Sequence, residues 1–541
     1  MGDEESSFTV FRAYLLRREF TWFDVFLWVI ANPLASGLLY YSVSATGSPG
    51  FYGGVVPYAF ISAGLLFIPI ALLFMITASS LPRSASPYIL VSRAFGALPG
   101  FLAIALYLFL SGGLLSIGFL AFSSTGILSD GFIVGGYITN NSYFTALGES
   151  LRSMIFTAII ALIVFTLIFI AGTLGRRAIR ILLYVSVATP LVLYIAILAS
   201  LYPFSNKVFI NNWNTLFNDS YGKIMSIALH GGVVNGVAVE ALKPVTGWNA
   251  TFALFGIAVW AYLGLENASF IAGEVKDPVN SYFKGYIAGF ATLVALYTVT
   301  PVIVTLIAGY DFLSAYSYLY HYYPGVLKII MGTNTLPSPS LVTIISVYTG
   351  NIYTSLIFSA TAYLFYFNTM LTIWLSATRG LLALSQDHLM PRFLARISRR
   401  TSTPLYSNLF IYVFSTLVLL LSFFIKSSQQ LELSFLKIMN LGYSVFLVFT
   451  GLSLISTPLF SEKLYSRFTY RNRGLLYIVG YTSSTIGFGL ALTVGANTSL
   501  TDVIVATSLF GAILLLFIAI TTYMKHRGVR YEEVFSRIPP M

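Results

Sequence analysis

Long apolar stretches recur along the whole chain, and short polar segments separate them. A helix needs about 20 apolar residues to cross a bilayer. Twelve stretches have that length, at about 22–44, 55–80, 98–125, 153–174, 178–201, 250–272, 284–308, 350–378, 405–425, 433–457, 474–495 and 501–524. Strands of a membrane barrel would instead alternate over about ten residues. The pattern therefore predicts an all-α integral membrane protein with twelve transmembrane helices.

Composition agrees with a membrane protein and excludes several chemistries. Only 9% of the residues are charged, whereas soluble domains carry about 25%. The chain has no cysteine, which excludes disulfides, iron–sulfur clusters and cysteine nucleophiles. Its four histidines are widely separated, and no Walker loop, nucleophile elbow or metalloprotease motif is present. We therefore expect no enzyme activity, no cofactor and no metal.

The basic residues predict the orientation, because cytoplasmic loops of membrane proteins are rich in Lys and Arg. With a cytoplasmic N-terminus, the outer loops hold six of the 30 basic residues, Lys437 lies inside span ten, and the remaining 23 are cytoplasmic. The sequence thus predicts a multi-pass protein of the cell membrane with both termini in the cytoplasm. The net charge of +11 is then a topology signal and requires no nucleic acid partner.

The loops and spans divide the chain into six segments. These are a cytoplasmic tail (1–21), a first five-helix repeat (22–201), a long extracellular loop (202–249), a second, inverted five-helix repeat (250–457), two additional helices (458–525) and a cytoplasmic tail (526–541). We expect residues 222–242 to form an outer cap, because they are too interrupted by glycine for a span, and residues 312–331 to form short interfacial helices. Sequons at Asn140 and Asn218 are candidate glycosylation sites, although outer loops are often simply rich in Asn and Ser.

Two spans contain a break in the middle of the membrane. Span one contains Asn32-Pro33 followed by Ser36-Gly37, and span six contains Gly264 followed by Glu266. Interrupted helices at corresponding positions of two inverted halves indicate the binding site of a secondary transporter. Free N–H groups at such breaks suit an anion and free carbonyls suit a cation, so an amino acid matches both. The alternative is an ordinary proline kink and a structurally satisfied glutamate.

Four motifs in the loops and in span one resemble the amino acid–polyamine–organocation family of amino acid permeases. The segment LPRSASPYILVSRAFG is similar to the family's Pro, Tyr, Arg and Phe-Gly positions, although Ser86-Pro87 stands where a glycine pair is usual. GEVKDPVNS resembles Glu-Val-x-Asn-Pro, with Asp277 for Asn. RGLLALSQDHLMP, followed by Pro404, resembles the family's Arg…Asp-Gly-Leu-x-Pro…Pro signature, except that this chain has His388 where the signature has Gly. In span one, Ala35-Ser36-Gly37 resembles the family's Gly-Ser-Gly.

The resemblance implies the leucine-transporter-type fold, with a five-plus-five inverted repeat and discontinuous helices one and six. It also implies a substrate site between those helices. Amides near Ser36, Gly37 and Leu38 would hold the substrate carboxylate, and carbonyls near Ala31 and Asn32 of span one and near Trp260 and Leu263 of span six would receive its amino group. Trp260 would be an aromatic gate. The substrate-binding candidates are Ala31, Asn32, Ala35, Ser36, Gly37, Leu38, Trp260, Leu263 and Gly264.

Three further groups carry candidate roles. Glu266 could couple transport to protons, because burial of a carboxyl favours its protonated form, or it could only brace the break. Hydroxyls and an amide of span eight could ligate sodium with carbonyls of span one, or they could only pack helices; these are Asn368, Thr369 and Ser376. Cytoplasmic ion pairs could close an inner gate, or the charges could sit in water; these are Arg93, Glu274, Arg379 and Asp387. Lys437 is expected to snorkel to the interface.

The sequence therefore predicts a secondary active amino acid transporter that works by alternating access. Glu266 is nearly alone as a charge near the breaks, which favours proton-coupled symport of neutral or apolar amino acids. An amino acid exchanger, or a cationic amino acid or polyamine transporter of the same fold, is the alternative. A non-transporting membrane scaffold is the alternative of another class. The expected partners are an amino acid, a proton or sodium, and membrane lipids.

Overall fold

The computed structural model describes residues 16–110, 114–426, 429–495 and 499–536. Within those residues, eleven helices are long and apolar enough to cross a membrane. They are α4 (Val56–Ser80), α7 (Leu114–Thr139), α9 (Met154–Leu174), α10 (Arg176–Leu183) continued by η4 (Tyr184–Ala188) and α11 (Thr189–Ser200), α14 (Asn249–Ala261) followed by η5 (Leu265–Glu274), α15 (Pro278–Ala308), α19 (Ile352–Gln386), α20 (Leu405–Lys426), α21 (Gln429–Phe460), α23 (Arg473–Gly495) and α24 (Leu500–His526).

The predicted first span is not among these eleven, because it is divided into short pieces. They are α2 (Trp22–Ala31), the π-helical η1 (Gly37–Tyr41), α3 (Ser42–Ser44) and η2 (Ala45–Gly47). Both spans that the sequence marked as interrupted are therefore broken in the structure, and each has a non-helical turn near its middle. The all-α membrane architecture is confirmed, and the count of twelve spans stays a prediction.

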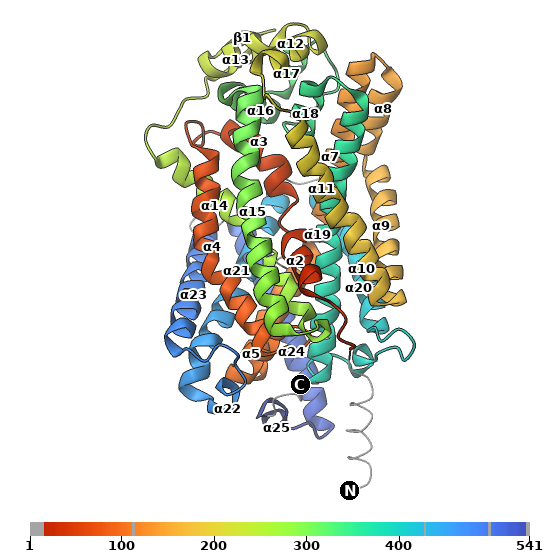
Figure 1. Ribbon diagram of the computed structural model, residues 1–541, viewed down its shortest axis with the longest axis vertical. Helices are drawn as coiled ribbons and strands as arrows, with labels where there is room; N and C mark the ends of the chain where they lie inside the picture. The colour runs from red at the N-terminus through yellow and green to blue at the C-terminus, as the bar shows by residue number, and fades with distance from the viewer. Residues whose placement is uncertain (1–15, 111–113, 427–428, 496–498, 537–541) are drawn as a thin grey trace.

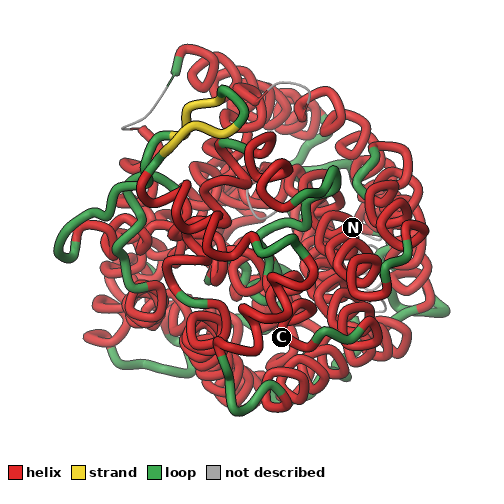
Figure 2. The backbone as a smooth tube through the Cα atoms, turned by 90° about the horizontal axis from the view of Figure 1, so that it is seen from above, coloured by secondary structure: helices red, strands yellow, loops and turns green. Residues whose placement is uncertain are grey.

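A cap of short elements covers one end of the bundle, as Figures 1 and 2 show. It consists of α8 (Ser142–Leu151), α12 (Asn206–Leu216), α13 (Ser220–His230), β1 (Gly232–Val234), β2 (Val237–Val239), α16 (Tyr310–Tyr322), α17 (Pro324–Met331) and α18 (Leu341–Thr349). Residues 222–242 thus form a helix and a hairpin of two antiparallel strands, with Gly232 paired to Val239, as expected of a cap. The two candidate glycosylation sites, Asn140 and Asn218, are exposed beside these elements.

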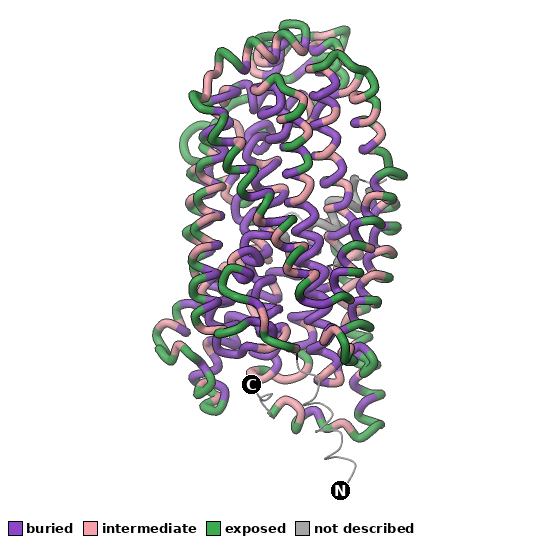
Figure 3. Tube along the Cα trace, turned by 45° about the vertical axis from the view of Figure 1, so that its right-hand side comes forward, coloured by how far each residue is buried: buried purple, intermediate pink, exposed green. Residues whose placement is uncertain are grey.

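The opposite end carries α5 (Ser86–Phe95), η6 (Arg392–Ala395), α22 (Glu462–Tyr465) and α25 (Tyr531–Ser536); α5, α22 and α25 are labelled at the foot of Figure 1. Between the two ends, buried residues lie along the centre of the bundle and exposed ones at its periphery (Figure 3). Many peripheral side chains are large and apolar, such as Ile155 and Val192, which are 71% and 67% exposed. Such surfaces suit contact with lipid.

The third span is longer than the sequence suggested. The prediction ended it at residue 125, but α6 (Ala97–Ala105) and η3 (Leu106–Leu110) are followed in the chain by α7, which continues to Thr139. The apolar pattern fails after 125 because the segment contains Asp130. That carboxylate is fully buried and accepts hydrogen bonds from Arg152, at 2.7 Å, and from Ser338 and Ser340. With these donors in place, the helix extends into the cap without exposing an unpaired charge.

We expect Asp130→Ala to lower the free energy of unfolding by about 3 kcal/mol, because removal of one partner leaves the other donors of a buried ion pair unsatisfied. The matched control is Glu533→Ala, whose ion pair with Arg530 is largely exposed and should contribute less than about 1 kcal/mol. Chemical unfolding of the two variants in detergent measures the difference. Equal effects of the two substitutions would contradict the assignment of Asp130 as the anchor of the cap.

Candidate functional site at the two helix breaks

The first break follows α2 and spans Asn32 to Ser36. Proline has no N–H and its ring clashes with the preceding turn, so the α-helix ends before Pro33. The chain resumes as a π-helix at Gly37. Asn32 and Ser36 at the two ends of the break keep accessible surface, whereas Ala31 before it and Ala35 within it are buried.

The second break separates α14 from the 3₁₀-helix η5. Gly264 adopts a φ of +107°, a conformation that side-chain-bearing residues rarely adopt. The turn that it permits brings Glu266 to the start of η5, where its carboxyl group is fully buried. Leu263, in the same turn, keeps accessible surface.

The two breaks touch each other through their glycines. A Cβ atom at Gly264 would lie 2.3 Å from Cγ of Asn32, and a Cβ at Gly37 would lie 2.5 Å from Cβ of Ala261. Neither distance is compatible with a side chain, so each glycine is required by a side chain of the other broken helix. The structure therefore brings together the residues of spans one and six that the sequence singled out.

Side chains of α15 take over the hydrogen bonds that the second break loses. The hydroxyls of Tyr282, Tyr286 and Tyr297 donate to the carbonyls of residues 268, 265 and 261, at 2.7, 3.1 and 2.8 Å. The sequence analysis did not find these tyrosines. Their spacing along α15 places them on roughly one face of the helix, which is the only sequence signal that could have indicated them.

Side chains of two other helices also donate hydrogen bonds to the backbone of η5. Ser376 of α19 donates to the carbonyl of Asn267 at 3.4 Å, and Ser86 of α5 donates to that of Ser269 at 2.9 Å. Irregular backbone at membrane depth is tolerated when protein groups satisfy it. The unwound segment is thus held from α5, α15 and α19 together.

Some backbone groups at the breaks remain free within the described residues. The N–H groups of Ala35, Ser36 and Gly37 donate no hydrogen bond there, and the carbonyls of Ala31 and Leu263 accept none. Other groups differ from the expectation: the Leu38 N–H donates to the carbonyl of Ala35 at 3.2 Å, and the carbonyl of Trp260 accepts from Leu263 at 3.1 Å. The carbonyl of Asn32 accepts from Thr369.

Glu266 is embedded in a small polar network. Its Oε2 accepts from the N–H of Gly264 at 3.0 Å, and its Oε1 lies 2.8 Å from the hydroxyl of Tyr107 on η3. That hydroxyl also lies 3.0 Å from Oδ1 of Asn267, so it has two neighbours for a single proton. Nδ2 of Asn267 is buried and lacks a partner in the described part of the chain, and the buried hydroxyl of Tyr443 also lies close to the carboxyl group. The network therefore retains unused hydrogen-bonding capacity close to the carboxyl group.

Trp260 stands one turn before the second break. Its ring meets Tyr41 of η1 edge-on, with centroids 5.5 Å apart, and 38% of its surface is exposed. This edge-on contact joins the parts of the two broken helices that lie on the side of the cap.

The three candidate sodium ligands on α19 bond to different segments. Thr369 donates to the carbonyl of Asn32 at 3.0 Å, Ser376 bonds to the second break, and Asn368 donates to the carbonyl of Ser186 on η4. Thr369 and Ser376 are seven residues apart, which is about 10 Å along a helix. The three side chains do not converge on one point in this conformation.

All four residues of the predicted inner gate form buried ion pairs. Arg93 of α5 pairs with Asp387, which also accepts from Tyr88 at 2.6 Å. Arg379 of α19 pairs with Glu274 of η5 at 2.8 Å, and 2% and 1% of these side chains are exposed. Both pairs lie at the end opposite the cap, where they connect α5 to the C-terminal end of α19 and α19 to η5.

His388, beside the first of these pairs, departs from the resemblance in an informative way. Its backbone has a φ of +61°, the left-handed conformation that favours the glycine expected at this position. Burial, with the neighbouring charge of Arg392, lowers the pKa of His388. Its carbonyl accepts a hydrogen bond of 2.9 Å from Tyr531 of α25, so the C-terminal helix rests on this turn.

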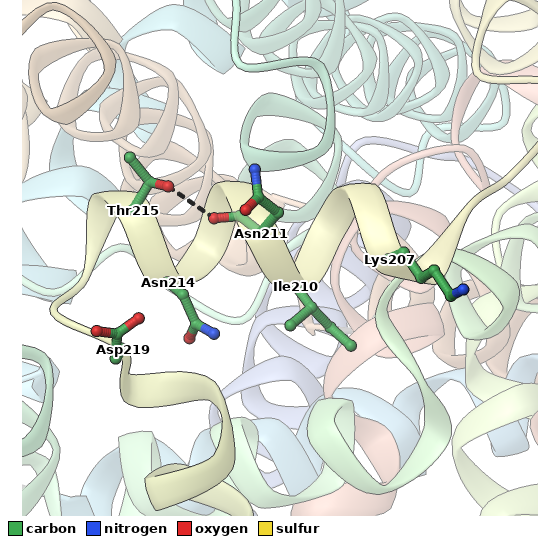
Figure 4. A pocket seen from close by; sticks show the side chains of 6 residues that line it. All are labelled: Lys207, Ile210, Asn211, Asn214, Thr215 and Asp219. Atoms are coloured by element: carbon green, nitrogen blue, oxygen red, sulfur yellow. Dashed lines mark hydrogen bonds between the residues drawn. The ribbon is translucent and has the colours of Figure 1, made fainter.

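Two other features lie away from the breaks. Lys437, which was expected only to snorkel, forms an ion pair of 2.6 Å with Asp502 in the first turn of α24. A hollow of about 420 Å³ lies on α12 in the cap and is lined by Lys207, Ile210, Asn211, Asn214, Thr215 and Asp219 (Figure 4). It contains none of the predicted substrate residues.

Comparison with known families identifies the chain. The model of a family described as amino acid permease matches residues 20–528. The chain belongs to the amino acid permease family. No curated protein matches this permease significantly. The match covers both broken helices and all the described helices that could span a membrane. It supports amino acid transport as the general function of the chain.

We expect Gly37→Ala to reduce amino acid uptake by about tenfold or more, because the added methyl group pushes the two breaks apart and small displacements of binding groups are costly. Gly256→Ala is the matched control: it lies on α14, where an added Cβ would meet nothing within 4 Å. Uptake into proteoliposomes, normalised to the amount of folded protein, measures both variants. Partial recovery in Gly37→Ala with Ala261→Gly is expected, and an unchanged Gly37→Ala would contradict the close packing of the breaks.

The lowered pKa of His388 predicts a pH-dependent stability. The unfolded chain binds a proton near pH 6.5 more readily than the folded chain does, so stability falls as the pH drops below about 6.5. We expect the apparent Tm to decrease from pH 7.5 to pH 5.5, and to decrease less in His388→Gly, which also removes the left-handed strain. Thermal unfolding at the two pH values tests this, and the same pH response in both proteins would refute it.

Proposed function

We propose that this permease is a secondary active transporter that carries neutral or apolar amino acids with protons by alternating access. The observation that carries the proposal is the pair of adjoining breaks with free backbone groups of both polarities. Both groups of polar atoms are fixed by the fold, so they need no reorganisation when a ligand arrives.

The free N–H groups of Ala35, Ser36 and Gly37 suit the carboxylate of an amino acid. They begin the outer half of helix one, and a helix N-terminus favours a negative charge. The free carbonyls of Ala31 and Leu263 suit its ammonium group, since each carries two lone pairs. One zwitterion could satisfy both sets, and neither an anion nor a cation alone could.

The neighbourhood of Glu266 favours a substrate without a charged side chain. Tyr107 stacks on Phe446 and Phe270, with ring centroids 4.4 and 5.4 Å apart, so aromatic surface surrounds the carboxyl group. A cationic side chain is the second candidate, because it could approach Glu266 and Trp260. A panel of substrates separates the two.

Glu266 supports a proton as the coupling ion. The carboxylate can accept from Tyr107, and the protonated carboxyl can donate to Tyr107 while that hydroxyl turns to Asn267. Both charge states therefore find partners among the same three side chains. The candidate sodium ligands on α19 do not converge, which favours the proton over sodium.

The buried ion pairs at the end opposite the cap support alternating access. Arg93 with Asp387 and Arg379 with Glu274 would have to separate before a substrate could leave at this end, which the distribution of basic residues assigns to the cytoplasm. Breaking a buried pair is costly, so the pairs would hold that end closed. Substrate binding at the breaks would then have to lower the free energy of the open conformation relative to the closed one. This conformation would then be closed on the inside.

The experiment that tests the proposal is uptake into proteoliposomes with labelled neutral, apolar and cationic amino acids under imposed proton or sodium gradients. We expect accumulation of neutral or apolar amino acids driven by an inward proton gradient. Accumulation driven by sodium, or only exchange against internal amino acid, would overturn the coupling. No transport of any amino acid would favour the scaffold alternative.

We expect Glu266→Gln to abolish gradient-driven accumulation and to retain exchange of amino acids across the vesicle, because the amide fills the same space but cannot release a proton. Glu533→Gln, an exposed carboxylate on α25, is the matched control and should behave as the unmodified permease. Accumulation and exchange are measured on the same vesicles. Undiminished proton-driven accumulation by Glu266→Gln would rule out the carboxyl group as the coupling site.

A further inference from the structure

One hydroxyl group lies against both breaks at once. Tyr297 of α15 donates to the carbonyl of Ala261 in the second break at 2.8 Å, and its hydroxyl also contacts the carbonyl of Pro33 in the first break. Its oxygen would lie 2.8 Å from a Cβ at Gly37. Among the three tyrosines of α15 that bond to the second broken helix, Tyr297 is the one whose hydroxyl also touches the first break in the described chain.

The position of this hydroxyl is fixed by its ring. The ring of Tyr297 stacks on Phe60 of α4, with centroids 4.9 Å apart and planes 3° apart, and it packs against Tyr262 at 5.0 Å. The side chain is almost completely buried. Because the ring is buried and packs against Phe60 and Tyr262, its hydroxyl is held at the point where both backbones meet it.

The chemistry of the contact is unusual in one respect. A tyrosine hydroxyl has a single proton to donate, and both of its neighbours here are carbonyls that can only accept. The proton can serve one carbonyl fully or be shared between two, and it can be shared only while the carbonyls of Pro33 and Ala261 stay side by side. If the two breaks move apart, one of the two carbonyls loses this donor.

We propose that Tyr297 is a positioning residue for transport that sets the relative placement of the two broken helices and thereby of the groups that bind substrate. The proposal rests on the proposed function. Ala31 lies two residues before Pro33, and Leu263 lies two residues after Ala261, so fixing the bonded carbonyls fixes the free ones. A role in substrate placement predicts a change in apparent affinity, whereas a role in packing alone predicts a change in stability.

The test compares three substitutions that each remove one buried hydroxyl. Tyr297→Phe loses contact with both breaks. Tyr286→Phe loses a bond to the second break only. Tyr194→Phe loses a bond of 2.7 Å to Thr300, which lies on α15 and outside the site. We expect the KM for uptake to rise about tenfold in Tyr297→Phe, to rise less in Tyr286→Phe, and to stay unchanged in Tyr194→Phe. In all three, Vmax per folded protein should stay within about twofold of the unmodified value. A tenfold change corresponds to about 1.4 kcal/mol.

A second variant keeps the test decisive if Tyr297→Phe does not fold. Incorporation of 3-fluorotyrosine at position 297 retains the ring and the hydroxyl and makes the hydroxyl a better donor, so the KM should fall below that of the unmodified permease. An equal or higher KM in this variant, or an unchanged KM in folded Tyr297→Phe, would overturn the proposal. A lower Tm with an unchanged KM would reduce Tyr297 to a packing residue.

The unmodified permease separates this inference from the proposed function. If it transports no amino acid, the proposed function fails before Tyr297 is tested. If it transports amino acids and the substitutions at 297 leave the KM unchanged, the proposed function stands and the inference fails. Substrate binding can be measured independently of transport as the rise in Tm that an added amino acid causes. In Tyr297→Phe, about tenfold more amino acid should be needed for the same rise.

Discussion

Hydrogen bonds from side chains to unwound backbone are the interaction on which the rest of this structure depends. In a bilayer an unsatisfied peptide group costs several kcal/mol, so a broken helix can exist only where other elements supply partners. Tyrosines of α15 bond along the second break, and Thr369 of α19 bonds to the first. Without these donors, the unwound backbone groups would be left unsatisfied in the membrane, and the two breaks would be much less stable.

The backbone groups that receive no such partner make up the candidate site. Once α5, α15 and α19 have satisfied most groups of the breaks, a few N–H groups on helix one and a few carbonyls on both helices remain. Their polarity corresponds to the two ends of an amino acid. Glu266 lies next to them with its own hydrogen-bond partners, so substrate binding and a change of protonation would act on the same short segment of backbone. The ion pairs at the far end tie this segment to α5 and α19 through Glu274 and Arg379.

The sequence predicted what depends on local chemistry. Asn32-Pro33, Ser36-Gly37 and Gly264 place helix-breaking and polar residues together in mid-span, so both interruptions could be located, and the loop motifs marked the four charged residues that pair at the end opposite the cap. The sequence did not predict Tyr297, because its partners lie 264 and 36 residues away and a tyrosine in an apolar helix is ordinary. It ended span three too early because the partners of Asp130 are distant in sequence: Arg152 pairs with its charge, and Ser338 and Ser340 donate hydrogen bonds to it. The partner of Lys437 was missed for the same reason.

The most direct measurement of the central claim uses the fact that the chain has no cysteine. A single Ser36→Cys thiol, nearly the same size as serine, would report from the first break, and Ser142→Cys on the exposed helix α8 would serve as the control. A transported amino acid should slow alkylation of Ser36→Cys, with half the effect near the KM for uptake, and leave Ser142→Cys unchanged. Alkylation of Ser36→Cys at the same rate with and without a transported amino acid would contradict binding at the breaks.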